Sequence, residues 1–526
     1  MLSVLNFCEL INNCSMATQN KFTRSLFNPE EFTTTFELVP GQGSGGRRID
    51  RLLDFARQAQ ADGRIKALSI TDNPGGHPAL APHAIGSEVL RIGIQPLLHF
   101  SLKDKNRNQV ESHLFLYHRQ GFNNLLILGG DFPRPSYYGQ ARPVFDLDSV
   151  QTLRLMRDME ESTYRSDAPN RDQEFAPVSF HRGCVVSPFK MTEAEQVWQY
   201  AKLLYKVRAG AHFIITQLGY DVCKFEELAS FLREQEIFMP VLANVFVPSL
   251  AVARYMSGGR VPGIVFPEKL LNAMEQEAQR GDREARLLRA AKLICVLRGL
   301  GFAGVHLGGN GLSFANVRFI LDTAEQLAPD WDKFRAEVHF SVKDTWYLYP
   351  PSRPGACGTI RIALSPGRRR AAQLPPRFMH RLFFSPPNLS SRLFGGLCRL
   401  CAHSRAGTTL LCTLEKVLKG ILFSCRMCGD CTLTESAYLC PQSGCPKNLL
   451  NGACGGSRYG ACEVFPDRAC FWVLVYNRAE KTTTLRQLGN LPHMTPKDWS
   501  LARTSSWINF YTGRDHHRLT SLSTKA

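Results

Sequence analysis

Eight short, β-rich segments alternate with longer helical patterns between about residue 32 and residue 325. Such alternation is typical of parallel strands joined by helices, and eight repeats predict an α/β fold, a (β/α)8 TIM barrel. A doubly wound sheet is the alternative, but no G-x-G-x-x-G motif follows the first strand. The strand candidates cover residues 32–39, 65–71, 94–100, 124–129, 177–183, 212–217, 239–245 and 303–308.

The segment before the sixth strand illustrates the helical pattern. Val197, Ala201, Leu204 and Val207 recur at helical spacing, and Gly210 suits the residue that closes a helix. The sequence therefore predicts a helix over residues 193–210.

A chain of 526 residues exceeds the size at which one hydrophobic core stops growing, so we expect at least two domains. After about residue 350 the regular pattern gives way to Pro- and Arg-rich sequence, which is typical of a linker. We interpret residues 1–15 as a non-native extension or a misassigned start, without function. The predicted division is an N-terminal extension over 1–31, a barrel over 32–345, a linker over 346–394, and a cysteine-rich domain with its tail over 395–526.

Hydrophobic residues make up 44% of the chain and charged residues 21%, which is ordinary globular usage. The sequence has no run of 18 or more apolar residues. Its N-terminus lacks the basic region and the small-residue cleavage site of a secretory signal. We therefore expect a cytoplasmic protein without a membrane partner.

The net charge of +17 is large enough to raise the question of nucleic-acid binding. However, many of the arginines fall in one Pro-rich stretch that lacks stacking aromatics at regular spacing. A solvated linker or a docking surface is therefore favoured, and we expect no nucleic-acid partner. The stretch contains Arg353, Arg361, Arg368, Arg369, Arg370, Arg377, Arg381, Arg392, Arg399 and Arg405.

Twelve of the seventeen cysteines lie between Cys357 and Cys470. In a cytosolic protein such density favours metal or iron–sulfur ligation over disulfides. Eight cysteines make two sets of four ligands, which suit a [4Fe–4S] cluster or zinc, and structural stapling without a redox role is the third alternative. Cys398 and Cys401 form a further C-x2-C pair that could complete a site. The eight predicted ligands are Cys425, Cys428, Cys431, Cys440, Cys445, Cys454, Cys462 and Cys470.

Polar residues lie at the points where the predicted strands end. In a barrel of this kind, the chemistry lies at the C-terminal ends of the strands. Any one of these residues could cap a helix or make an ordinary core hydrogen bond, but their convergence indicates one site. They are Glu37, Thr71, Asp72, His99, Asp131, Gln217, Asn244 and Asn310.

These strand ends also carry a resemblance to a known family. Over roughly residues 32–325 the chain resembles methylenetetrahydrofolate reductase, which is a flavin-binding (β/α)8 barrel. The most specific part is the strand ending in Gln217, together with Lys206 in the helix before it. The motifs are F-E at 36–37, S-I-T at 69–71, L-H at 98–99, G-G-D at 129–131 and A-G-A-x-F-I-I-T-Q at 209–217.

The resemblance implies reduction of 5,10-methylenetetrahydrofolate to 5-methyltetrahydrofolate, a product that feeds methionine synthesis. It implies a bound flavin, with NAD(P)H or a redox protein as electron donor. Glu37 would be the general acid that opens the folate's methylene bridge, Asp131 would act between flavin and pterin, and Gln217 would bind the pterin. A carboxyl group in a partly apolar barrel mouth is expected to have a raised pKa, so that it can deliver a proton near neutral pH.

The same resemblance assigns binding roles to other residues. Thr71 and His99 would contact the flavin or the nicotinamide, and Lys206 the flavin's phosphate-bearing chain. The full cofactor-binding set is Thr71, Asp72, His99, Gly129, Gly130, Asp131 and Lys206, and the substrate-binding set is Asp131, Gln217 and Asn310.

The chain departs from the family pattern at three positions. Gly129 stands where the best-known bacterial members have arginine, Asp72 replaces an aromatic residue, and Gly311 stands where an arginine near the folate tail is expected. These departures leave FAD and FMN as alternatives and leave open which residues hold the folate carboxylates.

The cysteine-rich region carries a second resemblance. Its C-G-D-C, C-P-K-N-L-L-N-G-A-C-G-G and T-S-S-W-I-N-F-Y-T-G-R-D-H-H segments are similar to the C-terminal domain that accompanies certain methylenetetrahydrofolate reductases of anaerobes and other bacteria. The region would either relay electrons to the flavin or brace the barrel. We expect it to dock on the barrel, with Trp507, Phe510 and Tyr511 as contacts. A non-catalytic metal-binding scaffold and another flavin-barrel dehydrogenase are the rival functions, and a homo-oligomer is left open.

Overall fold

The computed structural model describes residues 20–161, 163, 176–362, 374–385, 388–478 and 493–517. Within them, eight parallel strands pair in sequence order and close into a barrel, which confirms the predicted fold class. Residues 1–15 and the run Arg368–Arg370 lie outside the described residues. The strands are β1 (Thr33–Leu38), β2 (Ile65–Ile70), β3 (Gln95–Ser101), β4 (Asn124–Leu128), β7 (His181–Val186), β8 (Phe213–Thr216), β9 (Val241–Phe246) and β10 (Gly304–Gly308).

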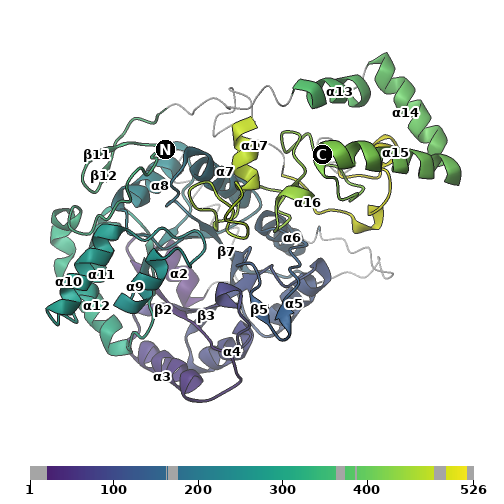
Figure 1. Cartoon of the computed structure of the whole chain (residues 1–526). Helices are drawn as coiled ribbons and strands as arrows, with labels where there is room; N and C mark the ends of the chain where they lie inside the picture. Colours follow the sequence, from purple (N-terminus) through teal and green to yellow (C-terminus); the bar gives the residue numbers. More distant parts are fainter. Residues whose placement is uncertain are drawn as a thin grey trace, which may run out of the picture.

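Helices surround the barrel (Figure 1), and the connection after β4 adds a short hairpin of β5 (Pro135–Ser136) and β6 (Gly139–Gln140). The predicted helix over 193–210 forms, and Gly210 follows its end with a φ of 98° that favours glycine. The helices are α3 (Arg47–Asp62), α4 (Pro82–Ile92), α5 (Arg107–Arg119), α6 (Ser149–Glu160), α7 (Glu193–Arg208), α8 (Val222–Glu234), α9 (Leu250–Ser257), α10 (Glu268–Gln279), α11 (Ala285–Gly299) and α12 (Phe314–Leu327), with 3-10 turns η2 (Pro74–Gly76) and η3 (Ala328–Phe334).

Each strand of the barrel turns alternate side chains toward the interior and toward the helices. On β1, Phe36 and Leu38 pack outward, and Phe36 stacks on Phe55 of α3 with ring centroids 4.2 Å apart. Thr35 and Glu37 therefore point into the barrel. This alternation decides which residues can meet in the mouth.

A short helix, α2 (Lys21–Phe27), closes the N-terminal end of the barrel. Phe22 meets Phe213 of β8 edge to face, with centroids 5.6 Å apart, among interior residues of other strands. Asn20 donates to Asn124 at the start of β4 over 3.1 Å. Residues 20–31, predicted as part of an N-terminal extension, are thus packed on the barrel. The mouth at the opposite end is where the site residues were expected.

The fifth strand of the barrel starts later than the sequence predicted. The prediction covered residues 177–183, whereas β7 runs from His181 to Val186. Val178 and Phe180 alternate with polar residues as a strand would, but they pack in the core as part of the segment that leads into β7. Buried alternation before a strand cannot be told from the strand itself by its pattern.

Residues 346–362, predicted as the start of a linker, pack against α8. The Tyr347 hydroxyl donates to Asp221 over 2.6 Å, and the Cys357 amide donates to Glu226 over 2.6 Å. The composition indicates a linker because Pro and Gly are frequent here. The carboxylates that hold the segment, Asp221 and Glu226, lie elsewhere in the sequence, so composition does not reveal them. The segment contains the short strands β11 (Pro351–Arg353) and β12 (Ala356–Cys357).

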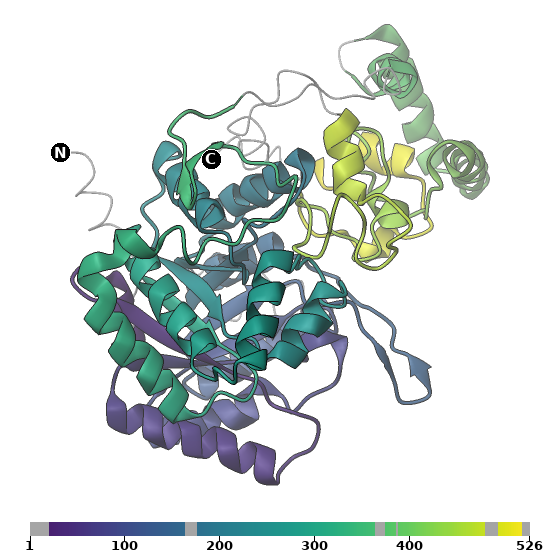
Figure 2. The same ribbon diagram turned by 60° about the vertical axis from the view of Figure 1, so that its left-hand side comes forward.

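Three helices form an arm that projects away from the barrel (Figures 1 and 2). They are α13 (Leu374–Phe384), α14 (Leu389–Ala402) and α15 (Arg405–Phe423), so part of the predicted linker is helical. In the part of the chain that the structure describes, no helix has the length and apolar character needed to cross a membrane.

Residues 425–478, here named the cysteine module, follow the arm. They contain two short helices, α16 (Pro441–Gly444) and α17 (Phe471–Arg478), and the last described segment contains η5 (Trp499–Leu501) and α19 (Ser506–Tyr511). On α19, Tyr511 lies 3.0 Å from the Ser391 hydroxyl and Trp507 meets Phe394, so the tail aromatics pack on α14.

The cysteine module packs on α6 and α7 of the barrel (Figure 2). Trp198 of α7 donates to the Trp472 carbonyl over 2.6 Å, and the Asn451 amide donates to Asp148, the cap of α6, over 2.9 Å. One continuous buried cluster joins the two parts. Docking is therefore as expected, but these contacts come from the module itself and not from the tail aromatics.

Candidate active site

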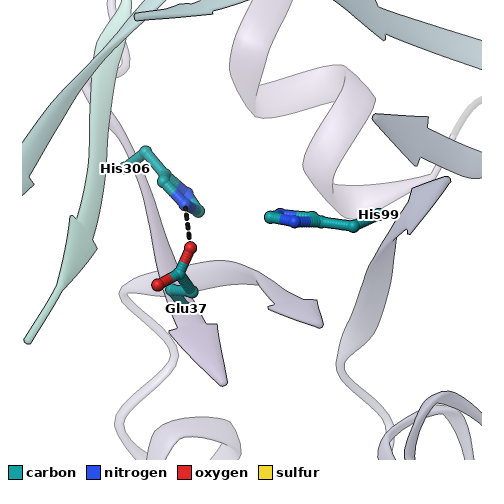
Figure 3. Close-up of side chains that lie close together, drawn as sticks. All are labelled: Glu37, His99 and His306. Atoms are coloured by element: carbon teal, nitrogen blue, oxygen red, sulfur yellow. Dashed lines mark ion pairs between the residues drawn. The ribbon is translucent and has the colours of Figure 1, made fainter. Parts of the chain in front are cut away.

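Three polar side chains meet inside the mouth of the barrel. Glu37 of β1 and His306 of β10 face each other with 3.7 Å between Oε2 and Nε2, and His99 of β3 lies beside them (Figure 3). The ligating atoms of all three lie within 4.8 Å of one another. The Glu37 side chain keeps 22% of its surface exposed, so solvent or a ligand can reach it.

Both histidine rings are held by hydroxyl groups from neighbouring strands. The Thr35 hydroxyl lies 2.9 Å from Nδ1 of His306, and the Ser69 hydroxyl lies 2.7 Å from Nε2 of His99. Because Thr35 pairs in register with His306 on the adjacent strand, β1 fixes both Glu37 and the ring that faces it.

The electrostatics of this group differ from the expectation. Burial alone would raise the pKa of Glu37, but the interaction with His306 outweighs burial and holds that pKa below its usual value. The predicted rise is therefore wrong in direction, because an apolar mouth was assumed and a histidine faces the carboxyl group. For His99, burial dominates and lowers the pKa to about 4, so this ring is neutral near neutral pH.

His306 was not predicted from the sequence, where Asn310 was expected to be the polar residue of the eighth strand. Asn310 lies in an exposed turn beyond β10. A usable signal was present, because Val305 and Leu307 flank His306 and pack outward. A polar residue between two outward-packing residues of a barrel strand must point inward.

The ends of β2 and β3 contain two buried hydroxyl groups without a partner among the described residues, Thr71 Oγ1 and Ser101 Oγ. Asp72, in contrast, is engaged: it accepts from the Lys105 ammonium over 2.8 Å and from the Ser101 amide over 3.0 Å. The geometry of Asp72 is that of a buried ion pair at the strand end.

The loop after β4 approaches the other strand ends closely. Gly130 has a φ of 82°, and a Cβ there would lie 2.2 Å from the Ser101 hydroxyl, so this position requires glycine. Asp131 accepts from the Gly75 amide of η2 over 2.8 Å. From the cysteine module, Lys447 donates to the Gly130 carbonyl over 2.8 Å.

The remaining predicted residues lie in less central positions. Gln217 is half-buried beyond β8 and bonds its own neighbour, since its Oε1 accepts from the Leu218 amide over 2.9 Å. Asn244 is half-buried on β9, and its amide donates to the Thr216 hydroxyl. Lys206 is buried on α7, where its ammonium donates to the Val185 carbonyl over 2.5 Å. Burial lowers the pKa of Lys206 to about 8.

The strand ends fit a planar aromatic cofactor such as a flavin. Buried hydroxyl groups without partners are uncommon, and the polar edge of a ring system would satisfy those of Thr71 and Ser101. At Gly129 no atom lies within 4 Å of the place a Cβ would occupy, so the chain leaves open space at the end of β4.

The eight predicted cysteine ligands lie in two groups of four, and Cys440, which the sequence left as an alternative to Cys445, belongs to the first group. Cys425, Cys428, Cys431 and Cys440 line one small cavity, and the Lys419 ammonium lies 3.5 Å from the Cys431 sulfur. Burial raises the pKa of Cys425 to about 11. A metal ion or cluster would reverse this effect, because thiolates bind metals only when deprotonated.

The second set consists of Cys445, Cys454, Cys462 and Cys470. Burial raises the pKa of Cys445 to about 12, and the nearby Cys454 and Cys462 thiols add to this rise. Cys398 is not part of either set: it packs with Leu411 and Ile508 in a small core between α14, α15 and α19.

Comparison with known proteins identifies both parts of the chain. The family model described as methylenetetrahydrofolate reductase matches residues 22–307, and the model described as methylene-tetrahydrofolate reductase C terminal matches residues 404–500. The first match spans more than half of the chain.

Two curated relatives match parts of the chain. Methylenetetrahydrofolate reductase 1 of Schizosaccharomyces pombe is 23% identical over 334 residues, which are 60% of this chain and 51% of the relative. The probable methylenetetrahydrofolate reductase (NADPH) of Caenorhabditis elegans is 24% identical over 261 residues, which are 48% of this chain and 34% of the relative. The chain thus spans about half the length of the first relative and a third of the second.

Among solved structures, an uncharacterized Clostridium thermocellum protein, described as binding two copies of 5-methyl-5,6,7,8-tetrahydrofolic acid, matches with a TM-score of 0.40 and 10% identity. That match covers 59% of this chain and 100% of the other. Tryptophan synthase of Mycobacterium tuberculosis matches with a TM-score of 0.30 and 12% identity, over 61% of this chain and 96% of that one.

Proposed function

This chain belongs to the methylenetetrahydrofolate reductase family, with the family's C-terminal domain fused behind the barrel, and on that premise we propose that it reduces 5,10-methylenetetrahydrofolate to 5-methyltetrahydrofolate. The cofactor would be a flavin, FAD or FMN, and the donor NAD(P)H or a redox protein. The observation that carries the proposal is the convergence of Glu37, His99 and His306 in the barrel mouth, next to unsatisfied hydroxyl groups and open space.

The reaction requires a proton for the nitrogen that leaves when the methylene bridge opens. Glu37 is placed to deliver it, since it lies inside the mouth and remains partly exposed. His306 lies 3.7 Å from Glu37 and would return a proton to its carboxylate. Thr35 keeps the His306 ring aligned for that transfer.

A bound flavin supplies the hydride chemistry, and the protein supplies binding, orientation and charge. Thr71 and Ser101 would satisfy polar atoms of the ring, and neutral His99 would contact it without adding charge. Asp131, held by the Gly75 amide, keeps one carboxylate oxygen for the pterin, and Gln217 would bind the pterin from the end of β8. Asn310 would contact the substrate from its exposed turn.

Spectroscopy with substrate tests this function. Protein purified with its cofactor should be yellow, its reduced flavin should be reoxidised by methylenetetrahydrofolate, and proline should leave the spectrum unchanged. A colourless protein that takes up no added flavin would identify a scaffold, and reoxidation by an imino acid alone would identify another dehydrogenase. Either outcome contradicts the proposal.

The cysteine module would bind metal through the two sets of four thiols described above. One support is the small cavity that the four thiols of the first set line together. The other is the proximity of the thiols in the second set, where Cys454 and Cys462 raise the pKa of Cys445. Iron with acid-labile sulfide in anaerobically purified protein would identify [4Fe–4S] clusters, and zinc would identify structural sites. Cys428→Ser should lower the metal content, whereas Cys412→Ser, outside both sets, should not. Protein with neither metal contradicts the idea.

A further inference from the structure

The arm formed by α13, α14 and α15 exposes two apolar stripes. On α14, Leu389, Leu393, Leu397 and Leu400 follow one another at intervals of four, four and three residues, and Leu389 is 73% exposed. Residues at such intervals lie on one side of a helix. The opposite side is used for packing, since Cys398 lies in the buried core that α14 shares with α15 and α19.

The second stripe lies on α15 and also consists of exposed aliphatic residues on one side of the helix. Leu410, Leu414, Val417 and Ile421 follow at intervals of four, three and four residues, and Ile421 is 80% exposed. Leu411, on the packed side of α15, is buried in the shared core. An apolar surface of this extent is unusual on a soluble monomer and marks an interaction site.

The apolar surface continues beneath the arm. A groove of about 930 Å³ runs between the arm and the cysteine module, with Met379 of α13 and Leu418 and Leu422 of α15 among its lining residues. The arm therefore has an apolar surface on more than one side, formed by the two exposed stripes and by the lining of the groove.

All charged side chains that the arm exposes are positive. Its sequence contains seven Lys and Arg residues and one acid, Glu415. Glu415 is buried, where it accepts from the Lys419 ammonium over 2.8 Å. Arg392 and Arg399 each precede a leucine of the α14 stripe and are exposed. The exposed charged side chains are Arg381, Arg392, Arg399, Arg405 and Lys416.

These features favour an anionic lipid surface over a protein. A second copy would bring its own cationic arm against the first, which costs free energy through like-charge repulsion. The stripes contain only leucine, valine and isoleucine, whereas energetically dominant residues of protein interfaces are tryptophan, tyrosine and arginine, with leucine and valine under-represented. Basic helices with an aliphatic face are typical of segments that lie in the boundary between lipid headgroups and acyl chains.

We propose that the arm binds the surface of an anionic lipid bilayer. The two stripes enter the boundary between headgroups and acyl chains, and the arginines beside them contact lipid phosphates. The expectation of no membrane partner rested on the lack of a spanning segment and does not bear on surface binding. The inference is independent of the reaction in the barrel.

Vesicle sedimentation with the full chain tests the proposal. The protein should sediment with vesicles of phosphatidylcholine and phosphatidylserine, remain in solution with phosphatidylcholine alone, and be released by salt. Leu393→Glu combined with Ile421→Glu should abolish sedimentation, because each change removes an inserted side chain that contributes more than about tenfold. Leu288→Glu, at a partly exposed leucine of α11, is the matched control and should bind normally.

Charge variants give the second arm of the experiment. Arg392→Ser and Arg399→Ser should each weaken binding about fivefold, and Arg283→Ser, exposed at the barrel, should have no effect. All changed side chains are at least partly exposed, so an unchanged circular dichroism spectrum is expected. Failure to bind anionic vesicles overturns the proposal. So does a dimer in sedimentation velocity that the stripe variants dissociate, or binding to an oligonucleotide that vesicles cannot displace.

Discussion

Lys447 of the cysteine module donates to the Gly130 carbonyl at the end of the fourth barrel strand, over 2.8 Å. Gly129 stands where the resemblance to the family leads us to expect an arginine, and Lys447 brings a cation to the same loop from a distant part of the chain. Lys447 also pairs with Glu463 of its own module, and both side chains are buried. The module thus contributes directly to the surroundings of Asp131.

This pair should dominate the stability of the docked module. Lys447→Met leaves the Glu463 carboxylate buried without its ammonium partner, so we expect the free energy of unfolding to fall by about 3–5 kcal/mol. Lys447→Met combined with Glu463→Gln should recover much of the loss. Arg468→Met, at an exposed ion pair, should cost less than about 1 kcal/mol. Denaturant unfolding measures all three, and equal losses for Lys447 and Arg468 would contradict the assignment.

Glu37 should affect only one half of the reaction. Flavin reduction by a nicotinamide needs no protein acid, whereas opening the methylene bridge does. Glu37→Gln should therefore keep its flavin and its reduction rate, while folate reduction falls by roughly 10²–10⁴-fold. Asp131→Asn is the comparison, since a carboxylate near the flavin should influence both halves. Stopped-flow absorbance follows each step, and wild-type reoxidation in Glu37→Gln would refute the role.

His306 should set the pH range of the folate half-reaction. Because His306 holds the pKa of Glu37 down, His306→Asn should raise that pKa. The carboxyl group then stays protonated to higher pH, so the limb where the rate falls with rising pH should move upward. The maximum rate should fall as well, since a proton carrier is lost. A limb that stays in place, measured by reoxidation rates across pH, would exclude control by His306.

His517 should make stability depend on pH. Hydrogen bonds with Asp515 and Glu435 raise the pKa of His517 to about 10. A folded pKa above the unfolded value means that this stabilisation is fully present below about pH 6.5 and is lost as the pH rises toward 10. The difference in thermal midpoint between wild type and His517→Asn should shrink across that range. His403→Asn, at an exposed histidine, should show no such trend.

The barrel could be predicted because each of its strands is a short apolar run between helical patterns, and such periodicity survives in the sequence. The bounds of β7 could not, since Val178 and Phe180 are buried for tertiary reasons and imitate a strand. The segment 346–362 has loop composition and is held by Asp221 and Glu226, which lie far away in sequence.

Some residues of the site could likewise be predicted from the sequence, and others could not. Strand-end residues such as Glu37 and His99 could be located, because the barrel brings all C-terminal strand ends together. His306 required knowledge of which side of β10 faces inward. Lys447 lies 317 positions from its partner Gly130, and no local pattern records such a pairing. The lowered pKa of Glu37 is caused by His306, so it could not be predicted from the sequence either.

The continuous buried cluster between α7 and the cysteine module has a consequence for folding. Trp198 and Trp472 pack against each other in that cluster, with ring centroids 4.7 Å apart, although they belong to separate family models. A barrel expressed alone would expose this apolar face of α7 and tend to aggregate. The boundary between the two family models is therefore not expected to separate two unfolding units. Barrel and module should melt together, and a cut in the chain between them should leave a complex of two fragments rather than two proteins.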